Sequence, residues 1–130
     1  MSGTSLDGID IVYVKFQRKK SWNYKIIHAE TFKYDEFWKQ KLKSSQSLTK
    51  NGLKNLNENY TKLLASKIEE FINKKLIENI DFIGSHGHTI FHKPSKGYTF
   101  QIGNLDKLSS YLRRTVICDF RTRDVELGGQ

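Results

Sequence analysis

Cysteine, proline and long apolar runs are scarce in this 130-residue chain. Cys118 is the only cysteine, so no disulfide can form within the chain, and such sparse use is typical of a reducing compartment such as the cytoplasm. No apolar stretch approaches the ~20 residues that a membrane-spanning helix needs, and the polar residues from Ser2 onward are unlike a secretory signal peptide. These absences exclude a disulfide-stapled fold and predict a cytoplasmic protein with no membrane partner.

Positive charge is in excess. There are 22 Lys and Arg residues against 14 Asp and Glu residues, which gives a net charge of +8 and raises the question of a nucleic-acid partner. Basic residues cluster only at 18–20 and 39–43, and most of the others alternate with apolar residues along one long helical segment. This distribution is typical of a solvated helix face, so no nucleic-acid partner is predicted.

An antiparallel hairpin is predicted at the start of the chain. Residues 9–16 are apolar on both faces over much of their length, which is typical of a well-buried strand. Residues 17–23 are expected to turn, and residues 24–34 have the composition of a second strand. Because the two strands are joined by a short turn, they are expected to pair antiparallel.

Helices and short strands follow the hairpin. Asp35 can cap a short helix that ends near Lys43, and apolar residues recur at three- and four-residue steps over 53–76. The remaining elements are predicted in this order: a loop over 44–52, a strand ending at Gly84-Ser85, a strand over 98–102, a helix capped by Asn104, and a strand over 115–118. This order indicates one mixed α/β domain over residues 1–130.

The first ten residues, MSGTSLDGID, have the composition of a phosphate-binding turn. Two glycines can take backbone angles closed to other residues, and three hydroxyl side chains can donate hydrogen bonds to an anion. Asp7 and Asp10 repel a phosphate but suit a hydrated Mg²⁺ that accompanies a nucleotide. The spacing matches neither the Walker A motif nor the dinucleotide fingerprint, so an ordinary hairpin turn is the alternative.

Polar clusters follow two later strands, where α/β sheets place ligands. His86 and His88 are two residues apart, so on an extended backbone both side chains would face the same way. With His92 and Asp119 they suggest the metal site of a metal-dependent hydrolase. The alternative is that the imidazoles hydrogen-bond to neighbours or to a substrate. Residues 119–124, DFRTRD, put two arginines and two aspartates at a strand end, where a surface Arg/Asp network is the alternative to a ligand site.

Four motifs together resemble the anhydro-N-acetylmuramic acid kinases. They are MSGTSLDGID, the segment GSHGHT over 84–89, Gln101-Ile102-Gly103, and the segment over 119–124 followed by Gly128-Gly129-Gln130. The resemblance covers the whole chain. It implies the N-terminal lobe of an actin-like ATPase (ribonuclease H-like) fold, with a mixed sheet, an initial antiparallel hairpin and flanking helices, incomplete at both ends. It also implies an enzyme that uses ATP, Mg²⁺ and water to open the 1,6-anhydro ring and phosphorylate the 6-position, in peptidoglycan recycling.

The resemblance implies where each ligand binds. The ATP phosphates are expected at Gly3, Thr4, Ser5, Leu6, Asp7, Gly8, Ile9 and Asp10. Asp7 would reach Mg²⁺ through water. The sugar is expected at His88, Arg121 and Asp124, and Arg121 or its competitor Arg123 would pair with the lactyl carboxylate. Many relatives carry glutamine where His88 stands, and both side chains donate and accept hydrogen bonds with similar reach.

The resemblance also implies parts that this chain does not contain. Family members carry a strand ahead of the first motif, and their catalytic aspartate and adenosine-binding elements follow the segment that matches residues 128–130. No residue of this chain is therefore expected to be the general base, and the chain alone is expected to be inactive. Small-molecule partners and a homodimer are expected. The alternatives are a non-catalytic sugar- or nucleotide-binding remnant and the histidine-based hydrolase.

Overall fold

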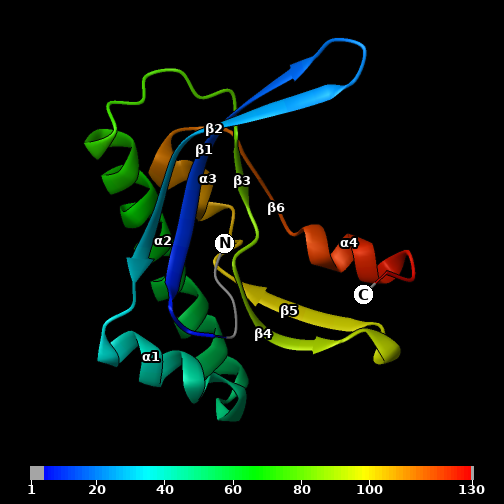
Figure 1. Cartoon of the computed structure of the whole chain (residues 1–130). Coiled ribbons are helices and arrows are strands. Elements are labelled where there is room, and N and C mark those ends of the chain that lie inside the picture. The colour runs from blue at the N-terminus through cyan, green and yellow to red at the C-terminus, as the bar shows by residue number, and fades with distance from the viewer. Residues whose placement is uncertain (1–4, 130) are drawn as a thin grey trace.

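The strands pair two by two in the computed structural model, which describes residues 5–129 (Figure 1). The two antiparallel pairs and one parallel pair are β1 (Gly8–Arg18) with β2 (Trp22–Lys33), β4 (His88–Lys93) with β5 (Tyr98–Ile102), and β3 (Ile83–Ser85) with β6 (Val116–Cys118). The predicted α/β class is confirmed. Within the described residues, however, the strands form three two-stranded ladders and not one mixed sheet.

The first hairpin is paired along its whole length but is buried only at its base. Its register runs from Gly8 opposite Lys33 to Arg18 opposite Trp22. Ile9 is 1% exposed, whereas Phe16 is 61% exposed. The prediction of a well-buried strand over 9–16 is therefore wrong for the outer half, because that half extends past the helices and no described element covers it (Figure 1).

Two capping residues set the start of the first helices. The Asp35 carboxylate accepts a hydrogen bond from the Trp38 N–H at 2.8 Å and begins α1 (Glu36–Lys43), as predicted. The Thr49 hydroxyl accepts from the Gly52 N–H at 3.2 Å and begins α2 (Lys50–Lys74). The expected loop over 44–52 is wrong in its last residues, because this cap starts the helix before its apolar repeat begins.

The core lies between α2, the base of the first hairpin, β5 and α3 (Lys107–Leu112). Tyr60 of α2 is fully buried at its centre, and its hydroxyl lies 2.6 Å from the Tyr34 hydroxyl. The ring of Trp38 packs edge-on against Tyr60, with the ring centroids 5.8 Å apart. The buried rings around Tyr60 therefore hold both the base of the first hairpin and the strand ends near β5 in place.

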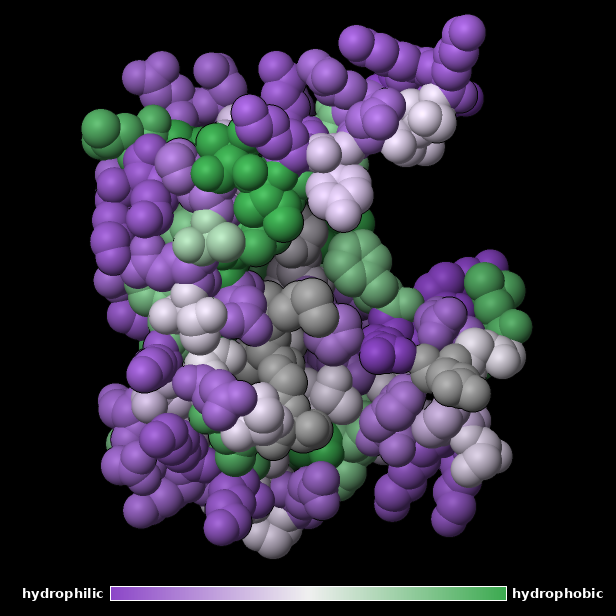
Figure 2. Space-filling view, viewed as in Figure 1, coloured by the Kyte–Doolittle hydropathy of each residue, from purple (hydrophilic) through white to green (hydrophobic). Residues whose placement is uncertain are grey.

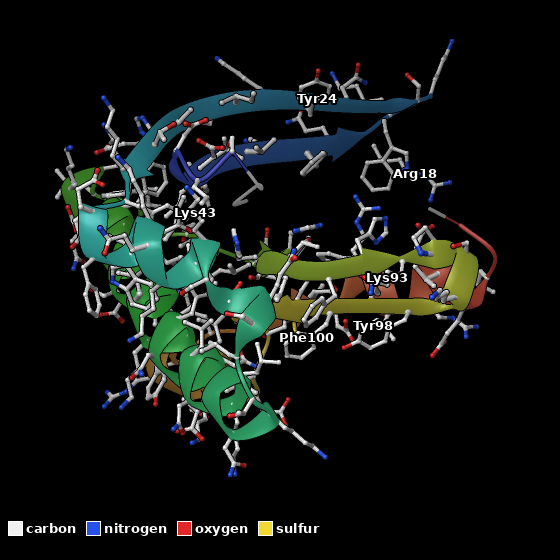
Figure 3. All side chains as sticks on the ribbon, turned by 90° about the horizontal axis from the view of Figure 1, so that it is seen from below. Arg18, Tyr24, Lys43, Lys93, Tyr98 and Phe100 are labelled. Atoms are coloured by element: carbon white, nitrogen blue, oxygen red, sulfur yellow. The ribbon has the colours of Figure 1, made fainter. Side chains whose placement is uncertain are left out.

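The face of the molecule in Figure 2 is mostly polar and has a hollow on one side. Figure 2 shows this hollow between the first hairpin and α4 (Phe120–Glu126), which follows β6. Figure 3 shows the two hairpins apart from each other, with Arg18 and Tyr24 on the first and Lys93 and Tyr98 on the second. Among residues 5–129, no helix combines the length and the hydropathy that crossing a membrane requires.

Candidate functional site

Three junctions between elements meet at the ends of β3, β5 and β6. Gly87, in the β3–β4 junction, has φ +70°, and a Cβ atom there would lie 2.3 Å from the Ile102 carbonyl oxygen at the end of β5. Asn104, just beyond β5, donates from Nδ2 to the His86 carbonyl at 3.3 Å. Cys118, the last residue of β6, donates from Sγ to the Asn104 carbonyl at 3.8 Å. The three junctions are thus joined into one unit through Asn104.

Asn104 therefore has a different role from the predicted one. The residue at the N-terminal end of α3 is Asp106, whose side chain makes no capping hydrogen bond, and Leu108 N–H donates to the Leu105 carbonyl at 2.8 Å. The prediction that Asn104 caps this helix is wrong, because its amide is used across the fold to hold the β3–β4 junction.

Arg121 and His86 are brought together at this unit. Arg121 lies in the first turn of α4, and its Nε donates to His86 Nε2 at 3.3 Å. His86 Nδ1 lies 3.4 Å from the Gly87 carbonyl oxygen. The prediction that residues 119–124 would present their charges directly after a strand is confirmed, since α4 begins two residues after Cys118.

His86 and His88 do not share a face. Because Gly87 between them is left-handed, the backbone there is not extended, and the expectation that both rings point the same way is wrong. His88 is 3% exposed, and its ring centroid lies 5.8 Å from that of Tyr60 in the core. His92 lies on the exposed end of β4, with Nδ1 3.3 Å from the Thr99 hydroxyl. In the described part of the chain, no three His, Cys, Asp or Glu side chains are grouped so as to hold a metal ion.

Burial keeps His88 neutral. Loss of solvation, with a smaller contribution from the nearby His86, lowers the His88 pKa from the usual 6.5 to about 4. The unfolded chain binds this proton more readily than the folded chain does. The contribution to stability is therefore fully present above pH 6.5 and is lost as the pH falls from 6.5 to 4.

We expect His88→Gln to reduce the acid sensitivity of the fold. From pH 7 to pH 4, the free energy of unfolding of the unmodified chain should fall by about 3 kcal/mol more than that of the variant, since 2.5 pKa units correspond to roughly that energy. Urea unfolding of both proteins at the two pH values measures the difference. Parallel pH dependence in the two proteins would contradict the burial of a neutral His88.

Arg123 and Asp124, two of the other charged residues of the 119–124 segment, are engaged with later residues of the chain. Arg123 pairs with Glu126 at 3.1 Å, and its side chain is 71% exposed. Asp124 is exposed and turned toward the end of the described chain, because its carbonyl accepts from the Gly129 N–H at 2.8 Å and its carboxylate lies beside Gly129. Of the two arginines, Arg121 is the one held at the strand ends.

The N-terminal turn is described only from Ser5 onward, so predicted contacts of Gly3 and Thr4 lie outside the described residues. Leu6 is the left-handed residue of this turn, with φ 57°. Gly8 does not have a positive φ. A Cβ there would lie 2.4 Å from the Phe32 carbonyl oxygen, so close approach of the strands, and not an unusual backbone angle, requires glycine. This corrects the predicted reason for that glycine.

The carboxylates of the turn differ in their surroundings. Asp7 is exposed, and its backbone carbonyl accepts from the Tyr34 N–H at 3.4 Å. Asp10 accepts a hydrogen bond from the Thr31 hydroxyl at 2.6 Å. The side chain of Ile9 is in the core, so only its backbone is available to a ligand. An exposed carboxylate next to a tight turn fits a contact to Mg²⁺ through water.

Two buried acceptors at the junctions lack a protein donor. They are Gln101 Oε1 and Asn104 Oδ1, while Gln101 Nε2 donates to the Thr99 hydroxyl at 2.6 Å. The sequence predicts His86 as a metal ligand or a hydrogen-bonding residue but does not identify Arg121 as its partner. Nothing in a linear pattern pairs it with a residue 35 positions later.

Polar side chains thus converge at strand ends, which is where α/β domains commonly bind small molecules. A family model described as anhydro-N-acetylmuramic acid kinase matches residues 1–130, and the chain belongs to this family. The Pelagibacter ubique enzyme of that name is 35% identical over 139 residues, covering 100% of this chain. Enzymes of the same name from Chromobacterium violaceum and Haemophilus influenzae are 37% and 36% identical over 99% and 100% of this chain. The chain spans only 35–36% of the length of these relatives.

Proposed function

We propose that this chain is part of a kinase that phosphorylates 1,6-anhydro-N-acetylmuramic acid with ATP and Mg²⁺ in peptidoglycan recycling. The relatives named anhydro-N-acetylmuramic acid kinase support the reaction. The observation that carries the site is Arg121, held by His86 where three junctions meet. We propose further that residues 1–130 form part of the N-terminal lobe of an actin-like ATPase fold. A homodimer and a cytoplasmic location stay predictions.

The proposed reaction breaks one bond of the sugar and transfers one phosphoryl group. Water attacks the anomeric carbon and loses a proton, the bond from that carbon to O6 breaks, and O6 takes the γ-phosphoryl group of ATP, which leaves as ADP. Mg²⁺, when bound, neutralises the phosphate charge, and the exposed Asp7 would contact it through water. The backbone and hydroxyl groups around Ser5 and Gly8 would contact the phosphates, together with Gly3 and Thr4. The general base is assigned to no residue of this chain.

The sugar would lie against the unit formed by the three junctions. Arg121 would bind the lactyl carboxylate, because a guanidinium matches a carboxylate with two parallel hydrogen bonds. The buried acceptors of Gln101 and Asn104 suit sugar hydroxyl or amide donors. His88 is 3% exposed, so contact between its ring and the sugar requires the β3–β4 junction to open. Asp124 would contact the sugar only after turning from Gly129.

Turnover by the full-length protein in water enriched in heavy oxygen tests this function. We expect ATP consumption to depend on the anhydro-sugar, and mass spectrometry should find the heavy atom at the anomeric hydroxyl of a sugar 6-phosphate. The 130-residue chain is the matched control and should release no ADP. Heavy oxygen in the phosphate, or ATP consumption that is independent of the sugar, would overturn the proposal.

A further inference from the structure

We propose that His86 is a positioning residue for Arg121, and that it orients the guanidinium toward the carboxylate of the substrate. This inference rests on the proposed function, in which Arg121 binds that carboxylate. The direct observation is the hydrogen bond from Arg121 Nε to His86 Nε2 at 3.3 Å. The two residues are 35 positions apart and belong to different junctions, so the contact is made by the fold and not by local sequence.

The contact fixes the tautomer of the imidazole. The guanidinium carries only donors, so His86 Nε2 must accept and cannot carry a proton. The ring proton then lies on Nδ1, which is 3.4 Å from the Gly87 carbonyl oxygen and can donate to it. Both ring nitrogens are thereby used in one orientation. A protonated His86 would place a second donor and a second positive charge against Arg121, which the geometry does not allow without separation of the pair.

The backbone that carries His86 is held from two sides. The Asn104 amide donates to the His86 carbonyl at 3.3 Å, and Gly87 approaches the end of β5 so closely that no Cβ fits there. Cys118 links Asn104 to the strand that leads into α4 and Arg121. His86 and Arg121 are therefore attached to the same set of joined junctions, and their hydrogen bond couples the position of the guanidinium to that of the imidazole.

The bond at Nε selects one way of binding a carboxylate. A guanidinium can present a side fork made of Nε and one terminal nitrogen, or an end fork made of the two terminal nitrogens. Because Nε donates to His86, one of the two nitrogens of the side fork is already engaged by a protein contact. The side fork is therefore closed to the carboxylate. A carboxylate that binds while this contact is kept must then meet the terminal nitrogens. Loss of His86 should therefore weaken binding of the carboxylate and leave ATP binding unchanged.

Steady-state kinetics of full-length variants tests this role. His86→Leu keeps the bulk and removes the acceptor, and we expect it to raise KM for the anhydro-muramic sugar about tenfold, with KM for ATP unchanged. His86→Gln restores an acceptor at similar reach and should recover most of the affinity. His92→Leu removes an exposed histidine whose Nδ1 lies beside the Thr99 hydroxyl, and it should match the unmodified protein. An anhydro-sugar without the lactyl carboxylate should not distinguish His86→Leu from the unmodified protein.

Nitrogen NMR separates this inference from the proposed function. The full-length protein should show a neutral His86 with its proton on Nδ1 and a slowly exchanging Arg121 Nε–H, and His86→Leu should lose the slow exchange. Equal KM values for the anhydro-muramic sugar in His86→Leu and His86→Gln would overturn the positioning role. A proton on His86 Nε2 would also overturn it. If no anhydro-sugar is turned over, the proposed function fails, and the NMR result still decides whether His86 positions Arg121.

Discussion

Gly87→Ala is expected to destabilise the fold by more than about 3 kcal/mol. The new methyl group would lie 2.3 Å from the Ile102 carbonyl oxygen and 2.9 Å from Asn104 Oδ1, and both atoms belong to a part of the fold that cannot easily move. The left-handed backbone at φ +70° adds a further cost of about 1 kcal/mol for a residue with a Cβ. The substitution therefore combines overpacking with backbone strain at one position.

Gly97→Ala is the matched control for that prediction. Gly97 is also left-handed, with φ +61°, but within residues 5–129 no atom beyond its own chain neighbours lies within 4 Å of a Cβ built there. Its substitution should cost only the strain, about 1 kcal/mol. Urea unfolding of the two variants and the unmodified chain measures both effects. An equal loss of unfolding free energy in the two variants would mean that Gly87 in the β3–β4 junction is not in close contact with the end of β5.

Arg121→Ala is expected to lower kcat/KM for the anhydro-muramic sugar about a hundredfold in the full-length protein. Loss of a charged partner from a hydrogen-bonded pair typically costs 2–5 kcal/mol, and a hundredfold corresponds to about 3 kcal/mol. Arg121→Lys should recover little, because an ammonium group lacks both the planar fork and the Nε donor that His86 receives. Steady-state kinetics with the sugar as the varied substrate measures the loss.

Arg123→Ala separates the two arginines. Its side chain is 71% exposed and pairs with Glu126, so its removal should change kcat/KM by about twofold at most. A larger loss of kcat/KM in Arg123→Ala than in Arg121→Ala would contradict this assignment and would make Arg123 the residue that binds the carboxylate. A sugar without the carboxylate provides the internal control, since both variants should then resemble the unmodified protein.

Local patterns predicted most of the elements. Asp35 caps its helix because the cap bond joins residues three apart, and the strand over 98–102 appears with those bounds. Burial was predicted less well, since it depends on what lies over a strand. The residues over 9–16 are apolar over much of the strand, yet Ile9 is in the core, Ile11 and Tyr13 only pack against it, and Phe16 lies beyond it.

The sequence predicts where candidate site residues lie along the chain, but it does not predict which of them contact one another in the fold. A polar segment directly after a strand located Arg121 correctly just beyond the end of β6, although the helix α4 that carries it was not predicted. Its partner could not be found in the same way, because the bond to His86 depends on how β3 and β6 pair and on the turn at Gly87. The same fold-dependent contacts give Asn104 a bracing role in place of a helix cap. They also place the His88 side chain in the core, where burial favours the neutral imidazole.

A crystal structure of the full-length protein with the anhydro-muramic sugar and a non-hydrolysable ATP analogue would show which residue binds the sugar carboxylate. We predict this carboxylate within about 3.2 Å of the terminal nitrogens of Arg121, with Nε still bonded to His86. The phosphates should lie at the turn before β1. A carboxylate bound by Arg123, or a metal ion held between His86 and His88, would contradict it.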